Sequence, residues 1–162
     1  MDIKTLVIYG VIGGALGWAN SASLRYLHKR SIRNFNYPNK ERVNDIHQKR
    51  ELVVLCKYDE LFDSCIQAIN GLKGGKIKTE SKSGFYIYAT TSSSWKTFGD
   101  VIEANFTKLD EDNITLTITS RPKFKSTAID YGKNYENIEK ICEYLRMRFR
   151  ILSVNAPVFD AD

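Results

Sequence analysis

Hydrophobic and polar residues alternate with different periods along the chain, and these periods divide it into predicted strands and helices. Residues 51–58 form a short apolar run, which is typical of a strand. Residues 59–72 then place apolar side chains at helical spacing, behind Asp59 as a favourable N-cap residue. A cluster of three glycines after residue 70 predicts the end of this helix.

Further alternating segments predict a run of strands joined as hairpins. The four strands are residues 76–81, 85–91, 100–108 and 113–120. The last of them alternates isoleucine and leucine with threonine, which predicts one core face and one polar threonine face. A second helix is predicted over residues 134–149 with Asn134 as its N-cap, and residues 150–162 are expected to be irregular.

The predicted order is β-α-β-β-β-β-α. Consecutive hairpins require an antiparallel sheet, and each helix has a single apolar stripe that must be buried. We therefore expect an α+β domain over residues 51–149, a two-layer sandwich with both helices on one face of a five-stranded antiparallel sheet. This order resembles one repeat of the TATA-binding-protein-like fold and the helix-grip fold, a likeness of topology that implies no function.

The N-terminal stretch LVIYGVIGGALGWANSASL, residues 6–24, is apolar and contains four glycines. Residues 5–24 have about the length needed to cross a hydrocarbon core of about 30 Å. We therefore predict that residues 1–24 are a transmembrane helix acting as a signal-anchor. The glycines have overlapping G-x-x-x-G spacings that would let the helix pack closely against a second helix in lipid: Gly10, Gly13, Gly14 and Gly17.

Three other interpretations of this stretch compete with a membrane span. A dinucleotide-binding loop is excluded because the tight G-x-G is missing and basic residues follow instead of a second strand. A cleaved export signal fits the short apolar core and the Ala-Asn-Ser-Ala sequence after it, but basic residues directly downstream oppose translocation. A soluble amphipathic helix is the third alternative.

The chain has a net charge of +5, and this charge is concentrated near its start. Residues 25–50 contain eight Lys and Arg against two acidic residues, and we interpret them as a basic juxtamembrane connector. Four of the basic residues are candidates for contact with a membrane surface or another anion: Arg25, Lys29, Arg30 and Arg33. Interleaved aromatic residues also permit a weaker hypothesis, binding of nucleic acid.

The chain has three cysteines, which argues against a disulfide framework because the number is odd and no close pairing motif is present. Each cysteine lies in an apolar pattern, so we interpret them as small buried hydrophobic residues. Reduced cysteines and the basic connector together predict a single-pass membrane protein with its C-terminal domain on the cytoplasmic, reducing side.

Two segments carry a more specific likeness. They are GFYIYATTSSSWKTFGD, residues 84–100, and SRPKFKSTAIDYGKNYENI, residues 120–138. Together they resemble a group of small uncharacterised bacterial proteins, in which a G-x-I-x-A strand leads to a Ser-Trp and Gly-acid turn. In that group a D-x-G-K-N-x-x-N-I segment then begins the last helix. The resemblance covers roughly residues 51–146, and it supports the fold without implying an activity.

Two candidate binding sites follow from these segments. Basic and amide side chains near the last helix can form an anion site at its N-terminus: Arg121, Lys123, Lys133 and Asn134. The alternative is that the DYGKN sequence only caps the helix. Trp95 and Phe98 lie in a Ser- and Thr-rich turn, where they either plug the open end of the sheet or form a patch for a ligand or partner.

No residue set predicts catalysis, a metal site or a cofactor. Both histidines lie in the connector, so the predicted domain contains no histidine to serve as a base. The acidic run at residues 110–112 lies at a hairpin tip, where a solvated turn is the simpler interpretation. We expect a non-enzymatic protein.

The leading hypothesis is a membrane-anchored domain that acts by association as an accessory subunit of a membrane assembly. Its expected partners are membrane lipid and other membrane subunits, or a second copy through the glycine stripe. The alternatives are a carrier of lipid or a small apolar ligand, with a cavity between the sheet and the last helix, and nucleic-acid binding through the connector.

Overall fold

The computed structural model describes residues 45–94, 97–127 and 129–155, together with the helical residues Ala22, Ser23, Tyr26 and Arg30. Its main elements are β1 (Gln48–Leu55), α2 (Tyr58–Asn70), β2 (Lys76–Ser81), β3 (Tyr86–Thr90), β4 (Asp100–Lys108), β5 (Asn113–Pro122), α3 (Lys133–Arg146) and β6 (Arg150–Asn155). The predicted α+β class is confirmed.

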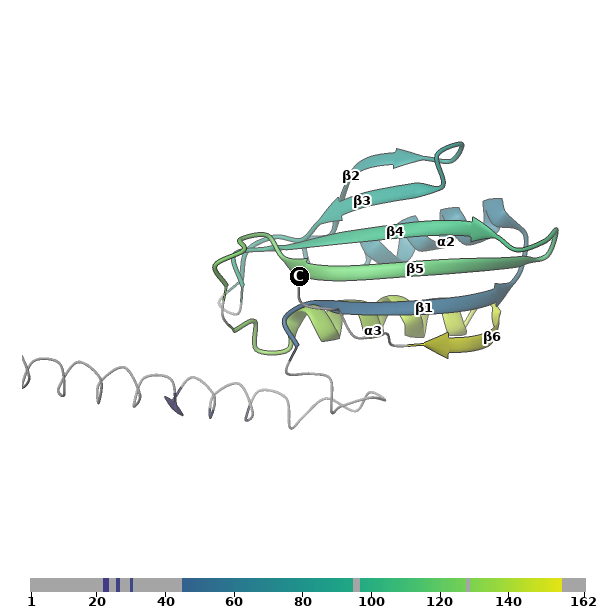
Figure 1. Ribbon diagram of the computed structural model, residues 1–162. Helices are drawn as coiled ribbons and strands as arrows, with labels where there is room; N and C mark the ends of the chain where they lie inside the picture. Colours follow the sequence, from purple (N-terminus) through teal and green to yellow (C-terminus); the bar gives the residue numbers. More distant parts are fainter. Residues whose placement is uncertain are drawn as a thin grey trace, which may run out of the picture.

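The strands form a six-stranded sheet in the order β2-β3-β4-β5-β1-β6. Every neighbouring pair is antiparallel. Both helices lie on the same face of this sheet, and they contact each other (Figure 1). The opposite face carries the half-buried threonines of β5, as the alternation of that strand predicts.

The prediction of five strands is wrong because the chain adds β6 after α3. Residues 150–155, expected to be irregular, pair with the outer edge of β1, with a register shift between Val53 and Val54. This strand is short and mostly exposed, so its own sequence lacks the alternation of a half-buried strand. Its pairing partner lies about a hundred residues earlier in the chain.

The boundary between connector and domain also lies earlier than predicted. β1 begins at Gln48, inside the segment interpreted as a solvated connector, and Arg50 is almost completely buried. The Arg50 guanidinium lies 2.7 Å from Glu139 Oε1 of α3 and 5.6 Å from the centre of the Tyr135 ring. The charge of Arg50 is therefore neutralised inside the domain.

The core fills the space between the sheet and the helices. Its buried aliphatic side chains include Leu52, Leu116 and Ile118 on the sheet and Ile138 on α3. In the described part of the chain, packed side chains thus occupy the layer where the carrier hypothesis places a cavity.

Two of the three cysteines behave as predicted for small buried hydrophobic residues, whereas Cys56 is half-buried and packs against the core. All three are free thiols, and Cys65 and Cys142 are fully buried in the core. Burial raises the pKa of each of these two thiols to about 12, and it raises the pKa of the half-buried Cys56 to about 11. Thiols with such pKa values remain protonated and unreactive at neutral pH.

The N-terminal predictions fall almost entirely outside the described residues. Of the predicted span over residues 1–24, the structure describes Ala22 and Ser23 alone. Among the described residues, no helix has the length and hydropathy to cross a membrane. Of the four basic residues proposed for the membrane surface, Arg30 is described, and it is exposed. The four glycines, Arg25, Lys29 and Arg33 lie outside.

Candidate functional site

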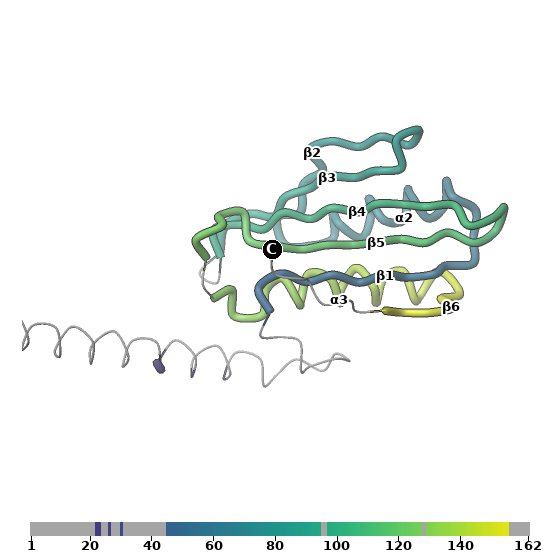
Figure 2. The backbone as a smooth tube through the Cα atoms, in the orientation of Figure 1, coloured from purple at the N-terminus to yellow at the C-terminus, as the bar shows by residue number. Residues whose placement is uncertain are grey.

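The connections at one end of the sheet form the candidate site. β3 ends there, β4 begins, and β5 runs on into the segment before α3 (Figure 2). Asp100, the first residue of β4, pairs with Pro122, the last residue of β5. We call residues 91–94, 97–99 and 121–127 the loop end.

Two phenylalanine side chains are exposed at the loop end. Phe98 is 71% exposed and Phe124 is 52% exposed, and their rings meet edge-on with centroids 5.9 Å apart. They flank a backbone hydrogen bond in which the Lys123 amide donates to the Gly99 carbonyl oxygen, at 3.0 Å. Only glycine fits position 99, because its φ is +95° and a Cβ there would lie 2.8 Å from the Thr91 carbonyl oxygen.

The phenylalanine pair borders an apolar groove of about 510 Å³. The groove is lined by Phe98, Phe124, Ser126, Thr127 and Ile129. Phe98 therefore does not plug the end of the sheet, and Trp95 lies outside the described residues. Phe124 was not predicted as a site residue, although an aromatic residue between two lysines in a turn-rich segment is an unusual signal.

A buried hydrogen-bond network lies between the loop end and α3. Asp100 Oδ2 accepts from the Thr91 hydroxyl at 3.1 Å and from the Asn137 amide at 2.9 Å. The Ser120 hydroxyl donates to Asn134 Oδ1 at 2.7 Å. Burial raises the pKa of Asp100, while the hydrogen bonds from Asn137 and Thr91 oppose this shift. The network joins β4 and β5 to α3 by side chains that are closed to solvent.

The beginning of α3 is capped by a residue other than the predicted one. Asp130 accepts hydrogen bonds from the Gly132 amide at 3.0 Å and from the Asn134 amide at 2.8 Å. Tyr131 and Gly132 both have positive φ, 53° and 72°, so the chain turns in the left-handed region before the helix. The glycine at 132 was expected to take a positive φ, but Asn134 lies inside the helix instead of capping it.

The four residues proposed as an anion site do not converge. Arg121 lies 3.1 Å from Glu103, and Lys133 lies 3.4 Å from Glu136, so both charges are paired. Asn134 is buried and bonded to Asp130 and Ser120. Lys123 is exposed on the loop end. The DYGKN sequence thus serves the turn and the helix start, as the capping alternative proposed.

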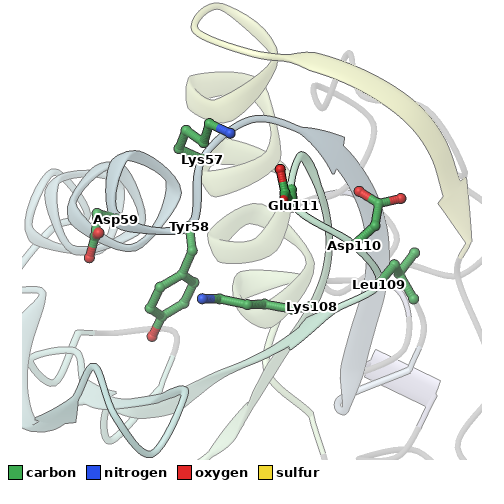
Figure 3. Close-up of a pocket in the computed structure, with 7 residues that line it drawn as sticks. All are labelled: Lys57, Tyr58, Asp59, Lys108, Leu109, Asp110 and Glu111. Carbon is green, nitrogen blue, oxygen red and sulfur yellow. The ribbon is translucent and has the colours of Figure 1, made fainter.

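A second pocket of about 620 Å³ lies at the opposite end of the sheet, beside the turn from β4 to β5. Figure 3 shows Lys108 extending toward the Tyr58 ring, whose centre lies 5.0 Å from Lys108 Nζ. Lys57 and Asp112 pair at 2.6 Å. Asp110 binds the amides of residues 112 and 113, which confirms a solvated turn at the acidic run.

No family model and no curated protein matches the chain. Among solved structures, that of Ara h 8.0201 aligns with 63% of this chain and 98% of its own length, with a TM-score of 0.41 and 12% identity. A likeness at this level identifies neither a fold family nor a role. The resemblance to the small bacterial proteins stays a prediction.

Proposed function

We propose that the chain is a membrane-anchored, non-catalytic association domain. The N-terminal segment holds the domain at a membrane, and the edge strand β6 pairs with a strand of another subunit of a membrane assembly. The domain lies on the reducing side, where its free cysteines remain thiols.

The observation that carries this proposal is the composition of β6. This strand is an outer strand of the sheet, and Leu152 and Val154 on it are 48% and 37% exposed. Leu55 on the neighbouring β1 adds a third exposed apolar side chain. An exposed strand edge with apolar residues is a template for pairing with another chain, and proteins normally protect such edges.

The other edge of the same sheet is protected. β2 exposes Lys76, Lys78 and Glu80, which are charges of the kind that discourage strand addition. The contrast between the two edges within one sheet supports a specific role for β6. An added strand would gain main-chain hydrogen bonds, and its side chains could cover Leu152 and Val154.

The test compares the two edges in the full-length protein extracted in a mild detergent. Leu152→Lys with Val154→Lys places charges on β6, and Thr79→Lys places a charge on the exposed part of β2 as the matched control. Thermal unfolding checks that all variants remain folded. Native mass spectrometry then measures the mass of the complex.

We expect the wild type and Thr79→Lys to run as a complex, and the β6 variant to run as a single chain. Photo-crosslinking from position 152 should give a discrete adduct that is absent from position 79. A wild-type protein that runs as a single chain, or an identical mass for all three proteins, would contradict association through β6.

A further inference from the structure

Building on the proposed membrane anchor, we propose that the loop end lies against the lipid bilayer. Phe98 and Phe124 enter the headgroup region, and Lys123 and Lys125 bind the phosphates of anionic lipids. The domain would then have a fixed orientation at the membrane, with a lipid-binding surface outside the predicted span.

The path of the chain supports this orientation. β1 begins at Gln48, which pairs with Ser120, two residues before the end of β5 at Pro122. Because a strand rises about 3.3 Å per residue, the start of β1 lies within about 7 Å along the sheet from the start of the loop-end segment 121–127. The chain that comes from the proposed anchor therefore reaches the domain at the loop end (Figure 1).

The charge of the loop end is complementary to an anionic membrane surface. Segments 97–99 and 121–127 contain three basic residues and no acidic residue. Arg121 is paired with Glu103, whereas the exposed Lys123 and Lys125 form no ion pair within the part of the chain that the structure describes. Among the nearby carboxylates, Asp100 and Asp130 are completely buried and Glu103 is paired with Arg121, whereas Asp45, before the start of β1, is exposed.

Hydrogen bonds fix the loops that carry the exposed phenylalanine pair. The rings project beside the Gly99–Lys123 backbone hydrogen bond, and the buried network around Asp100 supports the same loops. Insertion of the rings thus requires little ordering of loops on binding. Aromatic rings with flanking lysines suit the interface, where apolar groups contact acyl chains and ammonium groups contact phosphates.

The test uses the full chain reconstituted in vesicles of phosphatidylcholine and phosphatidylglycerol that contain brominated lipid, which quenches nearby tryptophan fluorescence. Three variants each keep one tryptophan. Trp95→Phe leaves Trp18 as a reporter of the anchor. Phe98→Trp in a Trp18→Phe, Trp95→Phe background reports on the loop end. Leu109→Trp in that background reports on the exposed opposite end.

We expect quenching of Trp18 and of the tryptophan at 98, but not of the tryptophan at 109. Quenching of Trp18 without quenching at 98 overturns the inference and leaves the anchor intact. Quenching at 98 without Trp18 upholds the lipid contact and contradicts the anchor. If neither is quenched, both the anchor and the lipid contact are wrong. Equal quenching at 98 and 109 overturns the proposed orientation.

A second measurement tests the lysines. Each lysine near an anionic surface strengthens binding by about fivefold. Quenching at position 98 should therefore decrease when Lys123→Gln and Lys125→Gln are combined, or when phosphatidylcholine replaces phosphatidylglycerol. The matched variant Lys76→Gln with Lys78→Gln on β2 should leave the quenching unchanged. Equal quenching in both double variants would show that charge has no part in the contact.

Discussion

The two ends of the sheet are built in opposite ways. Next to the loop end, polar side chains of β4 and α3 are buried, including Asp100, Asn134 and Asn137, whereas the loop end itself exposes Phe98 and Phe124. The opposite end, which we call the hairpin end (residues 57–62, 85 and 106–112), packs its aromatic rings together. Its four rings have neighbouring centroids 4.8–5.7 Å apart: Tyr58, Phe62, Phe85 and Phe106. Lys57 and the acidic turn at residues 110–112 carry charges on the surface of this end.

The difference shows how one small domain can combine stability with an exposed apolar surface. At the hairpin end, aromatic burial stabilises the fold directly. At the loop end, hydrogen bonds fix the connections, so the two phenylalanines are not needed for the core. Rigid loops that present apolar side chains to solvent are typical of interaction sites.

The largest expected effect concerns the hairpin end. Phe106 is buried among the other rings, so Phe106→Ala should lower the free energy of unfolding by about 3–5 kcal/mol. Phe124→Ala at the loop end makes the same change in an exposed side chain. It should alter the free energy of unfolding by at most about 0.5 kcal/mol. Urea unfolding measures both values. Similar losses in the two variants would remove the distinction between the ends.

The next effect concerns the buried hydrogen bonds at the start of α3, next to the loop end. Asp130→Ala leaves the buried amide groups of Gly132 and Asn134 without their acceptor, and it should cost about 2–3 kcal/mol. Asp110→Ala removes a comparable set of bonds from the exposed hairpin turn, and its cost should be clearly smaller because water replaces the lost acceptor. A larger loss in the free energy of unfolding for Asp110→Ala than for Asp130→Ala would contradict this expectation.

The pH dependence of stability should have opposite signs at the two ends. The pKa of Asp100 is raised above its ordinary value of 3.8, mainly by burial, so its contribution to stability is complete below that value and is lost as the pH rises through the folded pKa. The pKa of Asp110 is lowered by the hydrogen bonds from Asn113. Its contribution is therefore present above 3.8 and is lost as the pH falls through the folded pKa.

Asparagine at each position removes the titration. Between about pH 3 and pH 7, the stability of Asp100→Asn relative to wild type should rise with pH, and that of Asp110→Asn should fall. Chemical unfolding at a series of pH values measures both slopes. Two slopes of the same sign would contradict the opposite pKa shifts of Asp100 and Asp110.

The smallest effect on stability is expected for the exposed pair itself. The double variant Phe98→Ser, Phe124→Ser should keep the free energy of unfolding within about 0.5 kcal/mol of wild type, since neither ring is part of the core. The same variant should remove the contact of the loop end with lipid. A marked loss of stability would instead make the pair a structural element.

Local patterns predicted most of the fold. The alternation in β4 and the start of β5 gave their positions directly, because half-buried strands alternate in sequence. β6 and the buried Arg50 depend on partners far away in the chain, and neither has a local signature. Asn134 was predicted as the cap because it is polar and adjacent to the helix. The acceptor is Asp130, which reaches across a left-handed turn.

The candidate site was predicted less well for the same reason. Phe98 was singled out from its turn, but its neighbour Phe124 comes from a segment 26 residues later, joined to it by the Gly99–Lys123 hydrogen bond. The proposed anion site failed because Arg121 and Lys133 have carboxylate partners that the spacing of basic residues does not reveal.

Alkaline extraction of membranes that contain the full-length chain, followed by mass analysis of its N-terminus, tests the membrane anchor most directly. We expect the protein to stay with the membrane pellet at high pH and to retain the apolar stretch of residues 6–24. Release into the supernatant, or a mature product that begins near residue 23, would contradict the anchor and the orientation derived from it.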